Sequence, residues 1–251
     1  MDLKGKVGLV TGAAVGLGRS LAKELSTKGV RVALVDINHD GLGQTLGEIH
    51  DLGGEASLFV ADLMKSSEIE RVVQEIHALW GSVDIVANIA GLWHDKERTF
   101  IGKRLHEIPV SEIDALMGVN MRAPILVSRA CIPGMIERKR GKIINISGSF
   151  PEGGFGQVHY YVSKKGVEIF TQAVAPELRK HNIQVYCISP GDFDSEWFRT
   201  LVPEYLATCM KMEDVTRLAT FLLENPVADQ ITGGVIAIGD HWTQWAVGQH
   251  E

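Results

Sequence analysis

A tyrosine and a lysine with the spacing of a proton-transfer pair stand at Tyr160 and Lys164. Residues four apart in a helix lie on one face, so the two side chains are expected to be neighbours. A tyrosine hydroxyl titrates near pH ~10, and a nearby ammonium group favours the phenolate and lowers that pKa. The pair therefore has the chemistry of a general acid or base working near neutral pH. Two further candidates for this site are the Ser147 hydroxyl, which can hold a substrate oxygen, and the Asn120 amide, which can order water near Lys164.

A glycine-rich stretch, Thr-Gly-Ala-Ala-Val-Gly-Leu-Gly, runs from Thr11 to Gly18. It follows a β-branched, apolar run and opens a helical pattern, which is the context in which such glycines bind a dinucleotide. Gly12 permits the tight turn, Gly16 lets the backbone approach a pyrophosphate, and Gly18 lets the helix pack closely on the sheet. The N–H groups and the positive dipole end of that helix then face the phosphates.

Asp36 ends the second strand-like run, 18 residues after Gly18. A carboxylate at this place accepts hydrogen bonds from the adenine-side ribose and repels a 2′-phosphate. The glycine turn contains no basic side chain, and Arg19 is the only base close to it in sequence. This pattern favours NAD(H) over NADP(H). The alternative is that Asp36 caps a helix or lies in a solvated turn.

Two other strand ends carry candidate cofactor contacts. Asp62 follows the third strand-like run, where it can reach adenine or cap the helix that begins near Ser66. The sequence Asn-Ile-Ala-Gly at 88–91 follows the fourth run, and its small residues would let the chain pass close beneath a cofactor.

Strand and helix patterns alternate along the whole chain. The expected strands are Val7–Thr11, Arg31–Asp36, Ala56–Ala61, Val83–Ala87, Lys142–Ser147, Ile183–Ser189 and Gly234–Ile238. The expected helices are Leu17–Lys28, Asp40–Leu52, Ser66–Trp80, Ser111–Lys139, Tyr160–His181 and Glu213–Glu224. This alternation predicts a parallel sheet with right-handed crossovers and helices on both faces. We therefore expect a Rossmann-type, doubly wound α/β fold with seven parallel strands, forming a single domain over residues 1–251.

Two segments interrupt this alternation, Gly91–Pro109 and Gly191–Lys211, and each follows a strand end. Ligands of open α/β sheets bind beyond the carboxyl ends of the strands, so these segments are the expected walls of a substrate site. The first segment is rich in lysine and arginine, which suits an anionic or polyol substrate. The alternative is that both are solvated surface loops.

Composition narrows the classes of partner. The formal net charge of −6 gives no electrostatic reason for binding nucleic acid. No apolar run approaches the ~18 residues of a membrane span, and the N-terminus has no signal-peptide pattern. The three cysteines have no metal-ligand spacing, so we expect reduced thiols, no metal and a cytoplasmic location. The partner that we expect is a small-molecule substrate.

The combined motifs resemble the classical short-chain dehydrogenase/reductase family, from Lys6 to about Gly239. The matching motifs are Thr11-Gly12-x-x-x-Gly16-x-Gly18, Asn88-x-Ala90-Gly91, Asn120, a strand ending in Ser147, Tyr160-x-x-x-Lys164 and Pro190-Gly191. The resemblance implies a catalytic set of Asn120, Ser147, Tyr160 and Lys164. The cofactor contacts it implies are Gly12, Val15, Gly16, Leu17, Gly18, Asp36, Asp62, Leu63, Asn88, Ala90, Gly91, Tyr160, Lys164, Pro190, Gly191 and Ser195. It also implies a homodimer or homotetramer built on the helices Ser111–Lys139 and Tyr160–His181.

The chain departs from the family pattern at the serine and near the cofactor. Ser147 has the family's distance from Tyr160, but counting from the strand puts Gly148 in the catalytic place with Ser149 next to it. Spacing favours Ser147, and Ser149 stays open. The family's Asn-Asn-Ala-Gly has Ile89 as its second residue here, which removes one polar side chain near the cofactor.

A second tyrosine and lysine, Tyr161 and Lys165, share the spacing of the first pair. The family's Ser-Lys-x-Gly run matches Ser163-Lys164-x-Gly166, which favours Tyr160 and Lys164.

The segment after Pro190 is short for the family and has the makings of a reduced lid. Its candidate lid residues are Phe193, Trp197, Phe198, Tyr205 and Met210, with ordinary packing as the alternative. The sequence His241–Trp245 replaces the family's usual ending and either reaches a neighbouring subunit or caps the sheet.

These motifs lead to an expected function. We expect an NAD(H)-dependent oxidoreductase that interconverts a secondary alcohol and a ketone, with a polyol, sugar or hydroxy acid as the type of substrate. The alternative is a non-catalytic or regulatory NAD-binding protein on the same fold. Finding Ser147 and Ser149 both turned away from Tyr160 would favour that alternative.

Overall fold

The computed structural model describes residues 1–93, 100, 102–148, 157–194, 199–200, 206 and 209–239. A seven-stranded sheet forms its centre, with the strand order β3-β2-β1-β4-β5-β6-β7 and parallel pairing throughout. The strands are β1 Val7–Thr11, β2 Arg31–Asp36, β3 Ala56–Val60, β4 Ile85–Asn88, β5 Gly141–Ile146, β6 Ile183–Pro190 and β7 Val235–Ile238. The prediction of a doubly wound sheet with seven parallel strands is confirmed.

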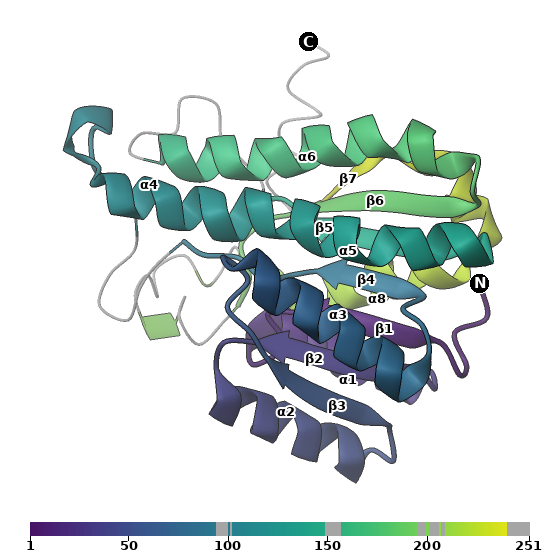
Figure 1. The fold of residues 1–251 in the computed structure, drawn as a ribbon. Coiled ribbons are helices and arrows are strands. Elements are labelled where there is room, and N and C mark those ends of the chain that lie inside the picture. Colours follow the sequence, from purple (N-terminus) through teal and green to yellow (C-terminus); the bar gives the residue numbers. More distant parts are fainter. Residues whose placement is uncertain are drawn as a thin grey trace.

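Helices cover both faces of this sheet (Figure 1). The α-helices are α1 Gly16–Thr27, α2 His39–Asp51, α3 Ser66–Trp80, α4 Val110–Leu116, α5 Ala123–Arg138, α6 Val158–Arg179 and α8 Met212–Glu224. Shorter helical segments are η1 Leu105–Glu107, η2 Met117–Arg122 and η4 Pro226–Ile231. The predicted helix Ser111–Lys139 is divided, because η2 is a π-helical segment between α4 and α5.

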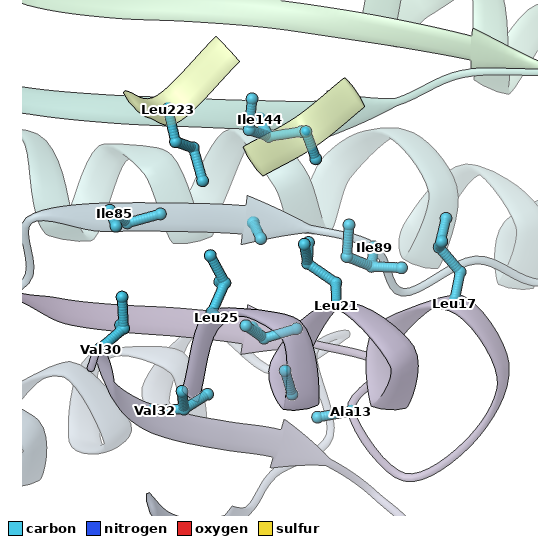
Figure 2. Packing of buried hydrophobic residues seen from close by; sticks show 14 of the residues in the cluster. Ala13, Leu17, Leu21, Leu25, Val30, Val32, Ile85, Ile89, Ile144 and Leu223 are labelled. Atoms are coloured by element: carbon cyan, nitrogen blue, oxygen red, sulfur yellow. The ribbon is translucent and has the colours of Figure 1, made fainter. Parts of the chain in front are cut away.

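The sheet separates two hydrophobic cores, since alternate residues of a strand point to opposite faces. Val10 belongs to the core on one face, together with side chains from α1 and α8. Figure 2 shows Leu21, Leu25 and Leu223 of this core. Leu9 belongs to the opposite core, with side chains from α3, α5 and α6. β1, β5 and β6 are buried along their whole length, as the inner strands of a parallel sheet covered on both faces are. β5 and β6 nevertheless contain the buried polar residues Lys142, Asn145, Gln184 and Ser189.

The strand order places the site. β1 has β2 on one side and β4 on the other, so the connections from β1 and β4 leave the sheet in opposite directions. A crevice opens at such a point beyond the carboxyl ends of the two strands. The glycine turn after Thr11 and the segment after Asn88 both begin at this crevice.

Among the described residues, no helix is both long and apolar enough to cross a bilayer. Within the same residues, no group of three or more His, Cys, Asp or Glu side chains is arranged to hold a metal ion.

Candidate active site

The glycine turn has the backbone geometry of a phosphate-binding turn. Gly12 has φ +67° and Gly16 has φ +54°, values that side-chain-bearing residues rarely adopt. A Cβ at Gly12 would lie 2.9 Å from Cα of Ala90, and a Cβ at Gly18 would overlap the carbonyl group of Gly12. The turn, the start of α1 and the end of β4 therefore fit together only because these positions are glycine.

Thr11 joins the two strand ends that form the crevice. Its buried Oγ1 accepts hydrogen bonds from the N–H groups of Ile89 at 3.0 Å and Ala90 at 3.1 Å. Thr11 was assigned no role from the sequence. Its hydroxyl at the last residue of β1 is the feature from which this bridging role could have been predicted.

The side chains of Asn88 and Ile89 face into the protein. The Asn88 amide donates to Oδ1 of Asn145 at 2.8 Å and to Oγ of Ser128 at 3.1 Å. Ile89 packs in the core with Leu17 and Leu21 (Figure 2). Of the 88–91 segment, Ala90 and Gly91 are thus the residues that adjoin the crevice, and a cofactor contact at Asn88 stays a prediction.

Asp36 lies at the edge of the glycine turn. Its carboxylate accepts hydrogen bonds from the N–H groups of Ala14 at 3.1 Å and Asn38 at 3.0 Å. The helix-cap alternative for Asp36 is wrong, because Asn38 caps α2 by accepting from the N–H of Gly41. The carboxylate is instead fixed between β2 and the turn.

Arg19 is held by groups of α2 and of the turn. Its Nε donates to the carbonyl of Ala14 at 3.1 Å, and its Nη1 pairs with Oε1 of Glu48 at 3.2 Å. Another of its nitrogens donates to Oε1 of Gln44. Redirecting Arg19 toward a phosphate would therefore break several existing interactions.

Asp62 adopts a local turn after β3. Its Oδ1 accepts from the N–H of Met64 at 2.9 Å, and the N-cap residue of α3 is Lys65. The cap alternative for Asp62 is therefore wrong. Leu63 is buried beside it.

Lys164 is the buried centre of the site. It is 5% exposed, and its Nζ donates to the carbonyl of Ile146 at the end of β5 at 3.2 Å. A Cβ added at Gly91 would lie 3.2 Å from the same Nζ. The nitrogen also lies 6.0 Å from the centre of the Tyr160 ring. One ammonium group therefore connects α6, β5 and the segment after β4.

The pKa values of this pair differ from the expectation. Burial raises the pKa of Tyr160 above its ordinary value, and the negative charge of Asp192 adds to this. Burial also lowers the pKa of Lys164 to about 8. The predicted lowering of the Tyr160 pKa by Lys164 is not seen, because burial disfavours both charged forms more than the 6.0 Å separation helps them.

Asn120 lies in the π-helical segment η2 and is 1% exposed. Its Oδ1 accepts from the N–H of Leu92 at 2.6 Å, and its Nδ2 donates to the carbonyl of Leu92 at 2.8 Å. The same amide donates to Oγ of Ser163 on α6 at 3.2 Å. Asn120 thus ties the start of the 91–109 segment to the helix that carries Tyr160, and π-helical turns occur often at functional sites.

Ser147 is 2% exposed, and its hydroxyl contacts two groups of α6. Oγ is 2.7 Å from Oε1 of Glu168, to which it donates, and 3.2 Å from the carbonyl of Lys164. Oε2 of Glu168 accepts from Nζ of Lys165 at 2.7 Å. This arrangement gives Ser147 and Glu168 a bracing role that the sequence did not reveal. Ser149 lies outside the described residues.

The far side of the site is described in part. Pro190 ends β6, and the N–H of Gly191 donates to the carbonyl of Ile238 at 2.9 Å. Phe193 and Met210 form a β-bridge and pack partly buried against the core, which supports ordinary packing for these two lid candidates. Ser195, Trp197, Phe198, Tyr205 and the segment His241–Trp245 lie outside the described residues.

The chain belongs to the short-chain dehydrogenase family. The family model described as short chain dehydrogenase matches residues 6–205. It is 34% identical over 204 residues to 5-keto-D-gluconate 5-reductase of Escherichia coli K12, covering 81% of this chain and 78% of that protein. It is 32% identical over 250 residues to the peroxisomal hydratase-dehydrogenase-epimerase of Neurospora crassa, covering 98% of this chain but only 26% of that larger protein.

Two solved structures are also similar. The 3-ketoacyl-(acyl-carrier-protein) reductase of Brucella melitensis, complexed with NADH, has a TM-score of 0.84 and 28% identity, covering 94% of this chain and 98% of the other. A metagenomic short-chain oxidoreductase in complex with NADP has a TM-score of 0.79 and 31% identity, covering 95% and 97%. The chain is thus an oxidoreductase of a family that acts on alcohol and keto groups with a nicotinamide cofactor.

The buried ammonium of Lys164 makes stability depend on pH. Its pKa is lowered from 10.5 to about 8, so between these values the folded state binds fewer protons than the unfolded state, and stability rises with pH. At pH 7 the burial costs about 3 kcal/mol, and Lys164→Met removes this cost. Urea unfolding at pH 7 and pH 9.5 should show the advantage of Lys164→Met over the native protein falling by about 2 kcal/mol.

Lys180→Met, at the exposed end of α6, is the matched control and should differ little from the native protein at both pH values. An advantage of Lys164→Met that stays constant over this range would contradict the lowered pKa.

Proposed function

We propose that the protein is an NAD(H)-dependent oxidoreductase that interconverts a secondary alcohol and a ketone, with Tyr160 moving the proton on oxygen. The observation that carries the proposal is the position of Lys164 between Tyr160, Ile146 and Gly91, at the crevice beside the glycine turn. A dinucleotide is compatible with this crevice because the turn has glycine at Gly12 and Gly16, where φ is positive, and a Cβ at Gly16 would meet nothing closer than Cε of Met212 at 4.0 Å.

When bound, the nicotinamide supplies or accepts a hydride. The pKa of Tyr160 is raised by burial, so its hydroxyl is protonated at neutral pH and ready to donate a proton to the oxygen of a ketone during reduction. In alcohol oxidation Tyr160 must first lose its proton, and the phenolate oxygen then accepts the proton of the alcohol. The ammonium of Lys164 lies 6.0 Å from the Tyr160 ring and attracts the phenolate once it forms, and by resemblance to the family we expect it also to bind ribose hydroxyls. Asn120 holds Leu92 and Ser163, which fixes the walls around the pair.

The preference for NAD(H) rests on charge around the adenine-side ribose. Asp36 presents a carboxylate at the edge of the turn. Val15 is 58% exposed at the place in the turn where a basic side chain would meet a phosphate. Arg19 is already bound to Ala14, Gln44 and Glu48. A 2′-phosphate would therefore meet the negative charge of Asp36, while the nearby cation, Arg19, is already engaged by other groups.

The substrate class is proposed to be a polyol, sugar or hydroxy acid. The named activity of the E. coli relative, 5-keto-D-gluconate 5-reductase, supports this class. Of the basic residues in the 91–109 segment, Lys103 pairs with Glu112 at 2.7 Å, so its charge is largely used within the protein. An acid substrate would therefore need a cation other than Lys103, and Arg104 in the same segment is exposed.

Tyr160→Phe removes the proton donor and leaves the ring in place. We expect turnover of the best substrate from a panel of ketones and alcohols to fall about 10²- to 10⁴-fold, the usual contribution of a general acid or base. The dissociation constant for NADH, measured by fluorescence titration, should stay within about threefold, because the ring still fills its place.

Tyr161→Phe is the control, since this neighbouring tyrosine has the same chemistry and another helix face. A Tyr160→Phe enzyme that turns over as fast as the native one would refute the role of Tyr160.

Asp36→Asn tests the cofactor preference. Loss of the charge should lower the ratio of kcat/KM with NAD⁺ to kcat/KM with NADP⁺ about 10- to 100-fold, the usual value of hydrogen bonds to a charged group. Asp40→Asn, on the exposed first turn of α2, is the control and should leave the ratio unchanged. A native enzyme that prefers NADP(H) would overturn the assignment to NAD(H).

The non-catalytic NAD-binding alternative gains one supporting observation, because the Ser147 hydroxyl binds Glu168 and the Lys164 carbonyl.

We expect Ser147→Ala to lower the free energy of unfolding by about 1–3 kcal/mol, because Glu168 loses a buried partner. Turnover should then stay within about tenfold, whereas Ser149→Ala should reduce it as a lost substrate hydrogen bond does, about 10²-fold. Measured turnover and urea unfolding of both variants separate these roles. If Ser147→Ala were inactive but fully stable, Ser147 would be the catalytic serine.

A further inference from the structure

A buried histidine precedes the proposed proton donor. His159 and Glu112 are 4% and 5% exposed, and their Nε2 and Oε1 atoms lie 3.1 Å apart. The other carboxylate oxygen of Glu112 accepts from Nζ of Lys103 at 2.7 Å. These three residues come from three elements: the segment before η1, the first turn of α4 and the first turn of α6.

The buried carboxylate of Glu112 has a cation beside it. A buried carboxylate is costly unless it is paired, and Lys103 supplies the compensating charge. The hydrogen bond to Glu112 requires a proton on Nε2 of His159. Nδ1 of His159 is buried with no hydrogen-bond partner in the described part of the chain. A proton on Nε2 fits both facts, because Nδ1 is then a hydrogen-bond acceptor and no N–H of the ring is buried without a partner.

The same face of α6 has a second attachment one turn later. Ser163 follows His159 by four residues and accepts the hydrogen bond from Asn120. Gly166 packs so closely that a Cβ there would lie 2.5 Å from Sδ of Met121. One face of α6 is therefore fixed against α4 and η2, while the neighbouring face carries Tyr160 and Lys164.

We propose that Lys103, Glu112 and His159 form a positioning relay. The ion pair holds the 102–109 segment, an expected wall of the substrate site, on α4, and Glu112 passes this constraint through His159 to the first turn of α6. The wall and the Tyr160 hydroxyl are thereby held in one geometry. The inference rests on the proposed function for its kinetic consequences, while the coupling itself is a property of the fold.

Amide hydrogen exchange tests the coupling without any activity measurement. Lys103→Met removes one end of the relay, and Lys103 is bonded to Glu112 on α4, not to His159. We expect exchange in a peptide covering residues 158–166 to quicken at least about threefold, because His159 loses a fixed partner. Lys28→Met, which breaks another lysine–glutamate pair (Lys28–Glu224), is the control and should leave this peptide unchanged. Unchanged exchange at 158–166 in Lys103→Met would overturn the relay.

Kinetics test the positioning of Tyr160. His159→Ala should lower kcat about 10- to 100-fold, the effect of misplacing a reacting group by about 1 Å. The NADH dissociation constant should stay within about threefold, because the glycine turn is not part of the relay. KM should also stay within about threefold, because the Lys103–Glu112 ion pair still holds the 102–109 segment in this variant. His159→Gln keeps an N–H that can reach Glu112 and should recover most of kcat. Equal kcat values for His159→Ala and the native enzyme, or failure of His159→Gln to recover, would reduce His159 to a packing residue. A native protein without turnover on any alcohol or ketone would instead refute the proposed function and leave the exchange result to decide the coupling.

Discussion

The site depends on one costly feature, an ammonium group buried at the junction of β4, β5 and α6. Lys164 is 5% exposed and has the carbonyl of Ile146 as a hydrogen-bond acceptor. A buried charge destabilises the fold unless nearby groups offset it, and burial accordingly lowers the pKa of Lys164 to about 8. A side chain at Gly91 would crowd this ammonium, because its Cβ would lie 3.2 Å from Nζ of Lys164.

Several side chains of the site form hydrogen bonds with backbone groups and so fix the path of the main chain. Thr11 fixes the N–H groups of Ile89 and Ala90, and Asn120 fixes both backbone groups of Leu92. Asp36 does the same for the glycine turn through Ala14. These contacts shape the crevice before any ligand enters, and a preorganised site loses less free energy on binding.

The fold could be predicted from the sequence because its signals are local and repeated. The apolar run Val7–Thr11 and the glycines up to Gly18 show a strand, a turn and a helix within a short stretch. The division of the long helix at Met117–Arg122 could not be predicted, since one extra residue in a π-helical turn leaves no trace in hydrophobic periodicity. Charged side chains that are buried, such as Glu112 and Glu168, also look like surface residues in sequence.

The serine shows the same limit in the site itself. Counting residues back from Tyr160 selects Ser147, yet spacing along the chain says nothing about where a hydroxyl points. In the structure Glu168, one turn after Lys164 on α6, accepts that hydroxyl, and the partner lies 21 residues from Ser147. A contact of that range can be found only once β5 and α6 are packed together. The same carboxylate of Glu168 also accepts a hydrogen bond from Lys165, the lysine of the second tyrosine–lysine pair. Lys164, the lysine of the first pair, instead lies beside Tyr160 at the crevice.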